Sequence, residues 1–326
     1  MISNCLRTLG LVIAAAITAL AVSSSRAQDY PTKPVRVVVP FTPGSLTDVS
    51  MRLVGQYLTE MWGHQVVVDN RTGAGGTIGS SIVAEATPDG YTLLAHSSGY
   101  AIAPALFPKW KVDMLRDFQA ISTLVASPHV ITVSPKLGPK NLKEFLEYAR
   151  NLGDRFSWAS AGVGSGTHFA GELFMTATKL KNVHVPYKGL PEALLDAITG
   201  RVNVFFSPLG PAVPFLNDGR ALGLAVTSKA RNPVVPNIPT VAEAGVPEAE
   251  IEIWFILAAP SKTPRPIVDK ISADVQKVLK LPAVTKTLEV SGVVAIPRSA
   301  NETQAFVATE IKMFREVAKA ANVPTF

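Results

Sequence analysis

Apolar residues follow two patterns along most of this chain, short continuous runs and a helical spacing. Runs of β-branched and other apolar residues at 35–39, 65–69 and 92–96 predict strands, and the first run is typical of a strand buried on both faces of a parallel sheet. A turn rich in glycine and hydroxyl residues follows each run. Beyond the first two turns, apolar residues recur at i, i+3 and i+4 spacing, which predicts amphipathic helices. This order of strand, turn and helix predicts an α/β fold.

The same order recurs in the middle of the chain. An apolar strand at 156–161 breaks into the small residues 162–166 and resumes as a helix with Phe169 on its apolar face. The first turn of a helix leaves backbone N–H groups unpaired and carries partial positive charge, and glycine lets a ligand approach the backbone. Ser165 and Thr167 add hydroxyls that can cap the helix or bind an oxyanion. The stretch is compatible with an ordinary capped turn or with an anion site.

A second loop of this kind favours the anion site. It follows the first strand at residues 40–48 and also leads into a helix. Asp48 suits either a structural first-turn carboxylate or direct ligand contact. Because the carboxyl ends of parallel strands meet at one edge of a sheet, we expect these loops to share a crevice with other strand ends. The predicted ligand-binding residues are Phe41, Thr42, Gly44, Ser45, Leu46, Thr47, Gly76, Thr77, Ser97, Ala161, Gly162, Val163, Ser165, Thr167, His168, Ser207 and Pro208.

Two predicted strands flank the second α/β block, at 129–134 and 251–259. They indicate two α/β lobes joined by two hinge strands. We expect lobe 1 to comprise residues 28–128 and 251–326, and lobe 2 to comprise residues 129–250.

Residues 1–27 have the pattern of a cleavable signal peptide. Arg7 precedes the uncharged apolar run 9–22, and Ser25-Arg26-Ala27 is a small-x-small cleavage signal. The run is short for a membrane span, and no other run of about 18 apolar residues occurs. We therefore expect a secreted, periplasmic protein.

Composition excludes several kinds of chemistry for the secreted chain. Removing Arg7 and Arg26 lowers the formal net charge from +6 to +4 and leaves no basic tract, so nucleic acid is not an expected partner. The single cysteine, Cys5, lies in the signal segment, which leaves no thiol for a disulfide, a metal or a nucleophile. The five histidines show no H-x-x-x-H pair, so we expect neither a metal nor another cofactor.

Six motifs, in order along the chain, resemble one family. They are Val39-Pro40-Phe41 with Gly44 and Thr47-Asp48; Asn70-Arg71 with Gly73-Ala74-Gly75-Gly76; Pro88-Asp89-Gly90-Tyr91-Thr92-Leu93-Leu94; Ser160-Ala161-Gly162-Val163-Gly164-Ser165 with His168; His184-Val185-Pro186-Tyr187-Lys188-Gly189; and Pro239-Thr240-Val241-Ala242-Glu243-Ala244-Gly245. Together they resemble the substrate-binding receptors of tripartite tricarboxylate transporters, the Bug or TctC-like family. The resemblance implies a two-lobed type II periplasmic-binding-protein fold that closes on a carboxylate held by loops 41–47 and 161–168. It also implies delivery of the ligand to membrane permease subunits.

Two departures from the family pattern narrow the expected ligand. The first loop reads Gly44-Ser45-Leu46-Thr47-Asp48 where the family usually has Gly-Gly-Pro-Thr-Asp, and Ser207 stands where amino-acid-binding members have an aspartate. A buried ammonium group needs a carboxylate partner, so we expect an amine-free dicarboxylate, aliphatic or aromatic, bound by a monomer. A ligand sensor for a two-component histidine kinase is an alternative. A secreted hydrolase is a weaker one, because the sequence shows no nucleophile motif, metal spacing or cofactor fingerprint.

Overall fold

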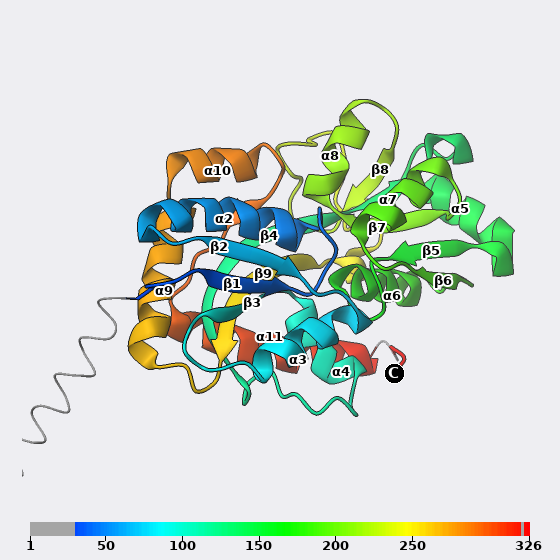
Figure 1. Cartoon of the computed structure of the whole chain (residues 1–326). Coiled ribbons are helices and arrows are strands. Elements are labelled where there is room, and N and C mark those ends of the chain that lie inside the picture. The colour runs from blue at the N-terminus through cyan, green and yellow to red at the C-terminus, as the bar shows by residue number, and fades with distance from the viewer. Residues whose placement is uncertain (1–29, 321–322) are drawn as a thin grey trace, which may run out of the picture.

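The computed structural model describes residues 30–320 and 323–326. The predicted signal peptide lies outside these residues. Two sheet regions with helices on their faces lie next to each other, and one long strand runs through both (Figure 1).

The first sheet region is mixed, with parallel and antiparallel strand pairs. Its strands are β1 (Val35–Val39), β2 (Val66–Asn70), β3 (Thr92–Ser97), β4 (Phe118–Val133), β9 (Glu252–Pro260) and the short β10 (Val294–Ala295). They follow the order β2-β1-β3-β9-β4, in which β1 is parallel to β2 and β3, while β9 is antiparallel to β3 and β4. The three apolar runs of the sequence therefore form the parallel strands that they predict, and β1 and β3 end at the same edge.

The second sheet region continues from the far end of β4. Its other strands are β5 (Ser157–Ser160), β6 (Val183–Pro186), β7 (Val204–Pro208) and β8 (Leu222–Val226). β7, β5 and β6 are parallel neighbours, and both β7 and β8 are antiparallel to β4. We call the α/β units built on the two regions the first lobe and the second lobe.

β4 is one continuous strand, whereas the sequence pattern predicts separate strands at 118–125 and 130–133. The residues between them stay extended because they pair with β9, with Ala126 opposite Trp254 and Pro128 opposite Glu252. Beyond Pro128, β4 pairs with β7 instead. The chain returns to the first lobe just before β9, where Ile251 N donates to Thr227 O at 3.0 Å. These two crossings confirm the two predicted hinge strands.

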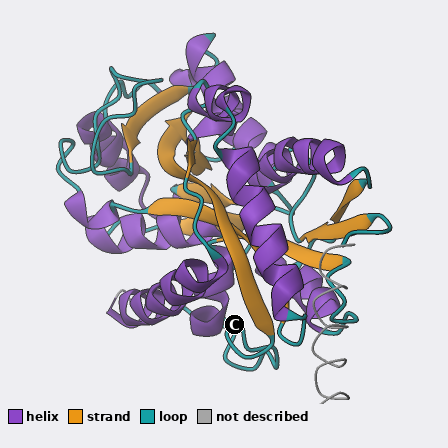
Figure 2. Cartoon of the chain, turned by 90° about the vertical axis from the view of Figure 1, so that its left-hand side faces the viewer, coloured by secondary structure: helices purple, strands orange, loops and turns teal. Residues whose placement is uncertain are grey.

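Helices cover both faces of each sheet region (Figures 1 and 2). The helices of the first lobe are α2 (Leu46–Trp62), α3 (Thr77–Ala84), α4 (Gly99–Leu106), α9 (Arg265–Leu279), α10 (Pro282–Glu289) and α11 (Ala300–Ala320). Those of the second lobe are α5 (Leu142–Leu152), α6 (Gly166–Thr178), α7 (Leu190–Thr199) and α8 (Leu209–Asn217). Along β1, Val37 and Val39 join a core with Met51 of α2, while Val38 joins a different core with Tyr100 of α4. Burial of alternate residues on both faces explains why β1 is apolar throughout.

Local sequence sets where the helices begin and end. The side chain of Ser45 accepts a hydrogen bond from Asp48 N and starts α2, and Gly63 ends it in the left-handed region at φ 66°. The apolar spacing predicts a helix at 303–321, but α11 begins three residues earlier, at Ala300. The reason is a capping box, because Glu302 N donates to Ser299 Oγ at 3.3 Å and Ser299 N donates to Glu302 Oε2 at 2.8 Å.

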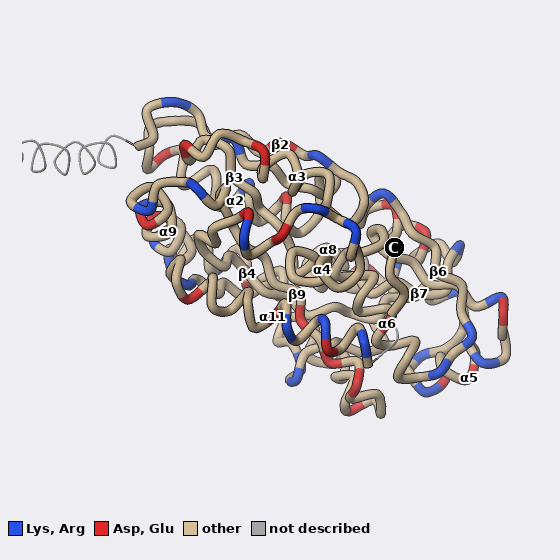
Figure 3. The backbone as a smooth tube through the Cα atoms, turned by 90° about the horizontal axis from the view of Figure 1, so that it is seen from below, with Lys and Arg blue, Asp and Glu red and all other residues tan. Residues whose placement is uncertain are grey.

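Charge is distributed over the surface with both signs interspersed (Figure 3). Among the helices of the described chain, none is long and apolar enough to cross a membrane.

Candidate ligand-binding cleft

A narrow cavity of about 30 Å³ lies between the two lobes. The first lobe contributes the loop after β1, the end of β3 and the start of β9, and the second lobe contributes the loops before α6, α7 and α8. The lining residues are Phe41, Ser45, Leu46, Thr47, Ser97, Ala161, Ser165, Gly166, Thr167, Gly189, Leu190, Pro208, Ile253 and Phe255. Among these described residues none is charged, and the polar side chains are all hydroxyls. The small volume shows that the lobes lie close together.

Two helix N-termini, one from each lobe, meet at this cavity. Ser45 caps α2, where its Oγ accepts from Asp48 N at 3.3 Å, and Ser165 caps α6, where its Oγ accepts from His168 N at 3.2 Å. An oxygen that accepts from the helix keeps its own O–H proton for another acceptor. Each helix also places the positive end of its dipole there. The pair can therefore receive a carboxylate from two sides without a cationic side chain.

A third hydroxyl joins the second-lobe cap. Thr167 Oγ1 accepts from Ala161 N at 2.8 Å and lies 2.9 Å from Ser165 Oγ. This bond closes the loop 161–167 onto itself, so that Ser165 and Thr167 are fixed before any ligand arrives.

The first-lobe loop is fixed by a buried carboxylate. Asp48 Oδ2 accepts from Gly44 N at 3.0 Å, and Oδ1 accepts from Arg52 Nε and from Asn70 Nδ2, each at 3.0 Å. Asn70 Nδ2 also donates to Phe41 O at 2.9 Å. Burial raises the pKa of Asp48, but the hydrogen bonds and the Arg52 charge outweigh it, so that its pKa lies below the ordinary value. Of the two alternatives for Asp48, the structure supports the structural one.

Several predicted site residues do not line the cavity. Gly76 packs on the ring of His96, and Thr77 Oγ1 donates to Ala74 O at 2.9 Å, so both serve the turn before α3. On the second lobe, Val163 O faces Gly75 of the first lobe, and a Cβ atom on Gly162 would meet Tyr187 O of its own lobe at 3.2 Å. The sequence pattern could not separate these positions from the cavity because all four sit in small-residue turns at strand ends.

His168 lies beneath the second-lobe loop instead of in the cavity. Its side chain is 1% exposed, its Nδ1 accepts from Gly164 N at 3.4 Å, and its Nε2 lies 3.4 Å from Glu172 Oε1. The ring also lies 4.7 Å from that of His184. His168 therefore supports the loop from behind.

The remaining three predicted residues lie beside the cavity. Gly44 donates its N–H to Asp48, and Thr42 lies against Gly189 of the second lobe with a buried hydroxyl that has no partner among the described residues. Ser207 Oγ donates to Pro208 O at 3.0 Å and is fully buried. Its hydroxyl is thus used within β7.

Sequence reasoning missed five lining residues. Ile253 and Phe255 alternate along the hinge strand β9, so period-two spacing could have placed them on one face. Gly189 is the last residue of the motif at 184–189, and Leu190 is the first residue of α7. Gly166 continues the loop that carries Ser165.

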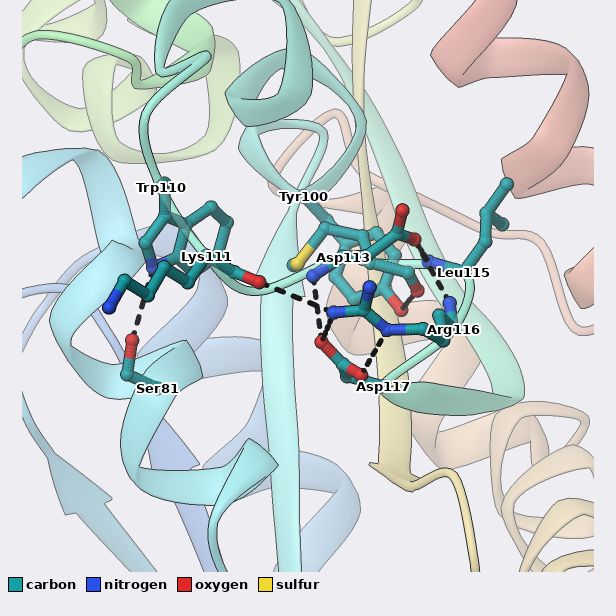
Figure 4. A network of polar contacts seen from close by, with 9 residues as sticks. Ser81, Tyr100, Trp110, Lys111, Asp113, Leu115, Arg116 and Asp117 are labelled. Carbon is teal, nitrogen blue, oxygen red and sulfur yellow. Dashed lines mark hydrogen bonds and ion pairs between the residues drawn. The ribbon is translucent and has the colours of Figure 1, made fainter.

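A larger cavity of about 610 Å³ lies on the first lobe, between α4, the following loop and α11. Its loop is braced by Arg116, which donates to both carboxylate oxygens of Asp117 at 2.8 Å, and by Trp110, whose Nε1 donates to Ser81 Oγ at 3.1 Å (Figure 4). Its lining contains none of the predicted site residues, and all of its lining residues come from the first lobe. The interlobe cavity is therefore the better candidate. Among the described residues, no group of three or more His, Cys, Asp and Glu is placed to hold a metal.

This architecture defines a periplasmic binding protein of the type II fold, with two α/β lobes, two hinge strands and a cleft between them. The solved structure of the periplasmic binding protein BugD is similar to this chain, with a TM-score of 0.88 and 32% sequence identity over 91% of this chain and 100% of that one.

The chain belongs to the tripartite tricarboxylate transporter family receptors, because the TctC family model matches residues 50–323. Two further solved structures from Rhodopseudomonas palustris are similar. Rpa4515 with adipate is 34% identical, with a TM-score of 0.88, over 91% of this chain and 100% of that one. MatC (Rpa3494) with bound malate is 33% identical, with a TM-score of 0.85, over 88% of this chain and 99% of that one.

Proposed function

We propose that this chain is a periplasmic receptor, and not an enzyme, that captures an amine-free dicarboxylate between its lobes. The observation that carries the proposal is the pair of helix N-termini from opposite lobes, which present hydroxyls at a cavity with no charged side chain in its wall among the described residues. Helix N-termini and hydroxyls suit a carboxylate. Adipate and malate on the two similar R. palustris proteins support the same ligand class.

The apolar part of the wall suits the body of such an acid. Phe41 and Leu46 from the first lobe and Leu190 and Pro208 from the second surround the hydroxyls. An ammonium group would find no carboxylate there, because Asp48 is already paired with Arg52 and Asn70. We therefore expect aspartate and glutamate to bind poorly.

Isothermal titration calorimetry tests this proposal. Adipate, malate and aromatic dicarboxylates are titrated against the protein, with aspartate and glutamate as matched amine-bearing acids. Ligand at about 100 times its dissociation constant should also add about 2.7 kcal/mol to the free energy of unfolding. Tight binding of either amino acid, or no binding of any dicarboxylate, would refute the proposed ligand class.

We further propose that a signal peptide at 1–27 directs export of the protein. We propose that the exported receptor is a monomer and delivers its ligand to permease subunits of a tripartite tricarboxylate transporter. The proposed lobe limits are 28–128 with 251–326, and 129–250. Capture of permease subunits from membranes by the liganded receptor supports transport, whereas capture of a histidine kinase supports the sensor alternative.

A further inference from the structure

The two lobes touch at backbone level on one rim of the cleft. The turn Gly73–Gly76 of the first lobe meets the loop 162–166 of the second. A Cβ atom built on Gly75 would lie 2.3 Å from Val163 O and 3.0 Å from the Cα of Gly164. Contacts under about 3 Å are not tolerated, and here the opposing atoms are backbone atoms that no rotamer change can move. Gly75 therefore has to be glycine for the lobes to come this close.

The other rim shows a second contact of the same kind. A Cβ built on Gly189 of the second lobe would lie 2.0 Å from Thr42 Oγ1 and 2.7 Å from Thr42 Cβ of the first lobe. Gly189 has φ −170°, which any residue adopts, so its own backbone does not call for glycine. Glycine is required there because Thr42, a β-branched side chain with a stiff χ1, approaches so closely.

We infer that Gly75 and Gly189 are positioning residues that set how far the cleft closes, and that closure brings Ser45 and Ser165 onto one ligand. This inference rests on the proposed function. The turn at 73–76 then serves lobe contact, although its sequence resembles an anion loop. Neither glycine needs to bind the ligand strongly itself, because each affects affinity by raising the fraction of molecules in the closed form. A ligand that binds the closed form has an apparent dissociation constant that is inversely proportional to that population.

Gly75→Ala tests the first rim, with Gly63→Ala as a matched control. Both glycines are left-handed, with φ 62° and 66°, but a Cβ on Gly63 meets nothing within 4 Å. The two variants therefore carry the same backbone strain and differ in the lobe contact. We expect Gly75→Ala to weaken dicarboxylate binding by about 10-fold or more and to lose ligand-induced compaction in solution scattering, while Gly63→Ala stays within about 2-fold of wild type. Equal affinities for the two variants would overturn the role of Gly75.

A compensating pair of substitutions tests the second rim. Gly189→Ala introduces the Cβ atom that would lie 2.0 Å from Thr42 Oγ1, and adding Thr42→Gly removes the side chain that it meets. We expect Gly189→Ala to weaken dicarboxylate binding by about 10-fold or more and to enlarge the radius of gyration of the ligand-free protein in solution scattering. Adding Thr42→Gly to Gly189→Ala should reverse the change in radius, and Thr42→Gly alone is the control.

The two outcomes separate the inference from the proposed function. If the wild type binds no dicarboxylate but Gly189→Ala enlarges the ligand-free radius and Thr42→Gly reverses the change, the proposed ligand is wrong and the closure contact stands. If the wild type binds a dicarboxylate and Gly189→Ala matches it in affinity and in radius, the inference about Gly189 is refuted.

Discussion

Two buried histidines predict that this protein loses stability in mild acid. His96 and His129 are 1% and 0% exposed. Burial lowers the pKa of His96 to about 4 against the opposing effect of its hydrogen bond to Ser97 O, and burial lowers the pKa of His129 to about 3. Neither ring nitrogen of His129 has a hydrogen-bond partner among the described residues, so nothing there offsets the cost of a charge.

Proton linkage gives the direction and the size of this loss of stability. In the unfolded chain a histidine titrates near pH 6.5. Below that pH the unfolded state takes up protons that the folded state does not, so the free energy of unfolding falls until the pH reaches the folded pKa values. At about pH 5 the loss is roughly 2 kcal/mol for each histidine and roughly 4 kcal/mol for both. Above about pH 7 the effect disappears.

Denaturant unfolding at about pH 7.5 and about pH 5 measures this loss. His129→Leu replaces an unpaired buried imidazole with an apolar side chain, so we expect it to remove about 2 kcal/mol of the acid sensitivity. His64→Leu, at a partly exposed histidine, is the control and should keep the full sensitivity. Equal losses of unfolding free energy by wild type and His129→Leu between the two pH values would contradict a role for His129 in the acid sensitivity.

Three other predictions test the cleft. Ser165→Ala removes a proposed ligand-binding hydroxyl as well as a helix cap and should weaken dicarboxylate binding by about 1–3 kcal/mol in calorimetry. Asn141→Ala removes the cap of α5 and should lower stability by about 1 kcal/mol without a change in affinity. Saturating dicarboxylate should reduce the radius of gyration in solution scattering, and an unchanged radius would count against hinge closure. Ser207→Asp would bury an unpaired carboxylate, so we expect denaturant unfolding to show a loss of about 3–5 kcal/mol at neutral pH; a stable variant would contradict the full burial of this position.

Much of the fold could be predicted from periodicity. The strand β1 is an uninterrupted apolar run because helices cover both faces of its sheet, and such a run is easy to recognise, whereas β2 at the edge of the sheet is only partly buried and ends in Asp69 and Asn70. Continuity of β4 was not predictable, because Pro128 reads as a break until its extended partner Glu252 is known. The early start of α11 was predictable in principle from the Ser299 and Glu302 capping box.

Only part of the cleft could be predicted from the sequence, because some of its residues depend on local contacts and others on contacts between the lobes. Ser45 and Ser165 could be found because a hydroxyl at a helix start does its work within four residues of chain. Gly189 owes its identity to Thr42 of the other lobe, 147 positions away, and Gly75 is required by its own left-handed turn and also by Val163 of the other lobe, 88 positions away. Sequence gives no signal for such a contact.

Glycine can therefore be required at these turns for two different physical reasons, and the sequence does not distinguish between them. Gly44 is left-handed at φ 80°, and a Cβ atom there would make only an ordinary contact with Pro191 Cγ at 3.8 Å, so its own turn requires glycine. Gly189 is extended and needs no special backbone, so the approach of the opposite lobe requires it. A receptor that holds an anion with hydroxyls and helix ends, and without cationic side chains, depends on bringing both lobes close to one ligand. Glycine at the lobe contacts makes that approach possible, and this connects the small-residue turns of the sequence to the affinity of the cleft.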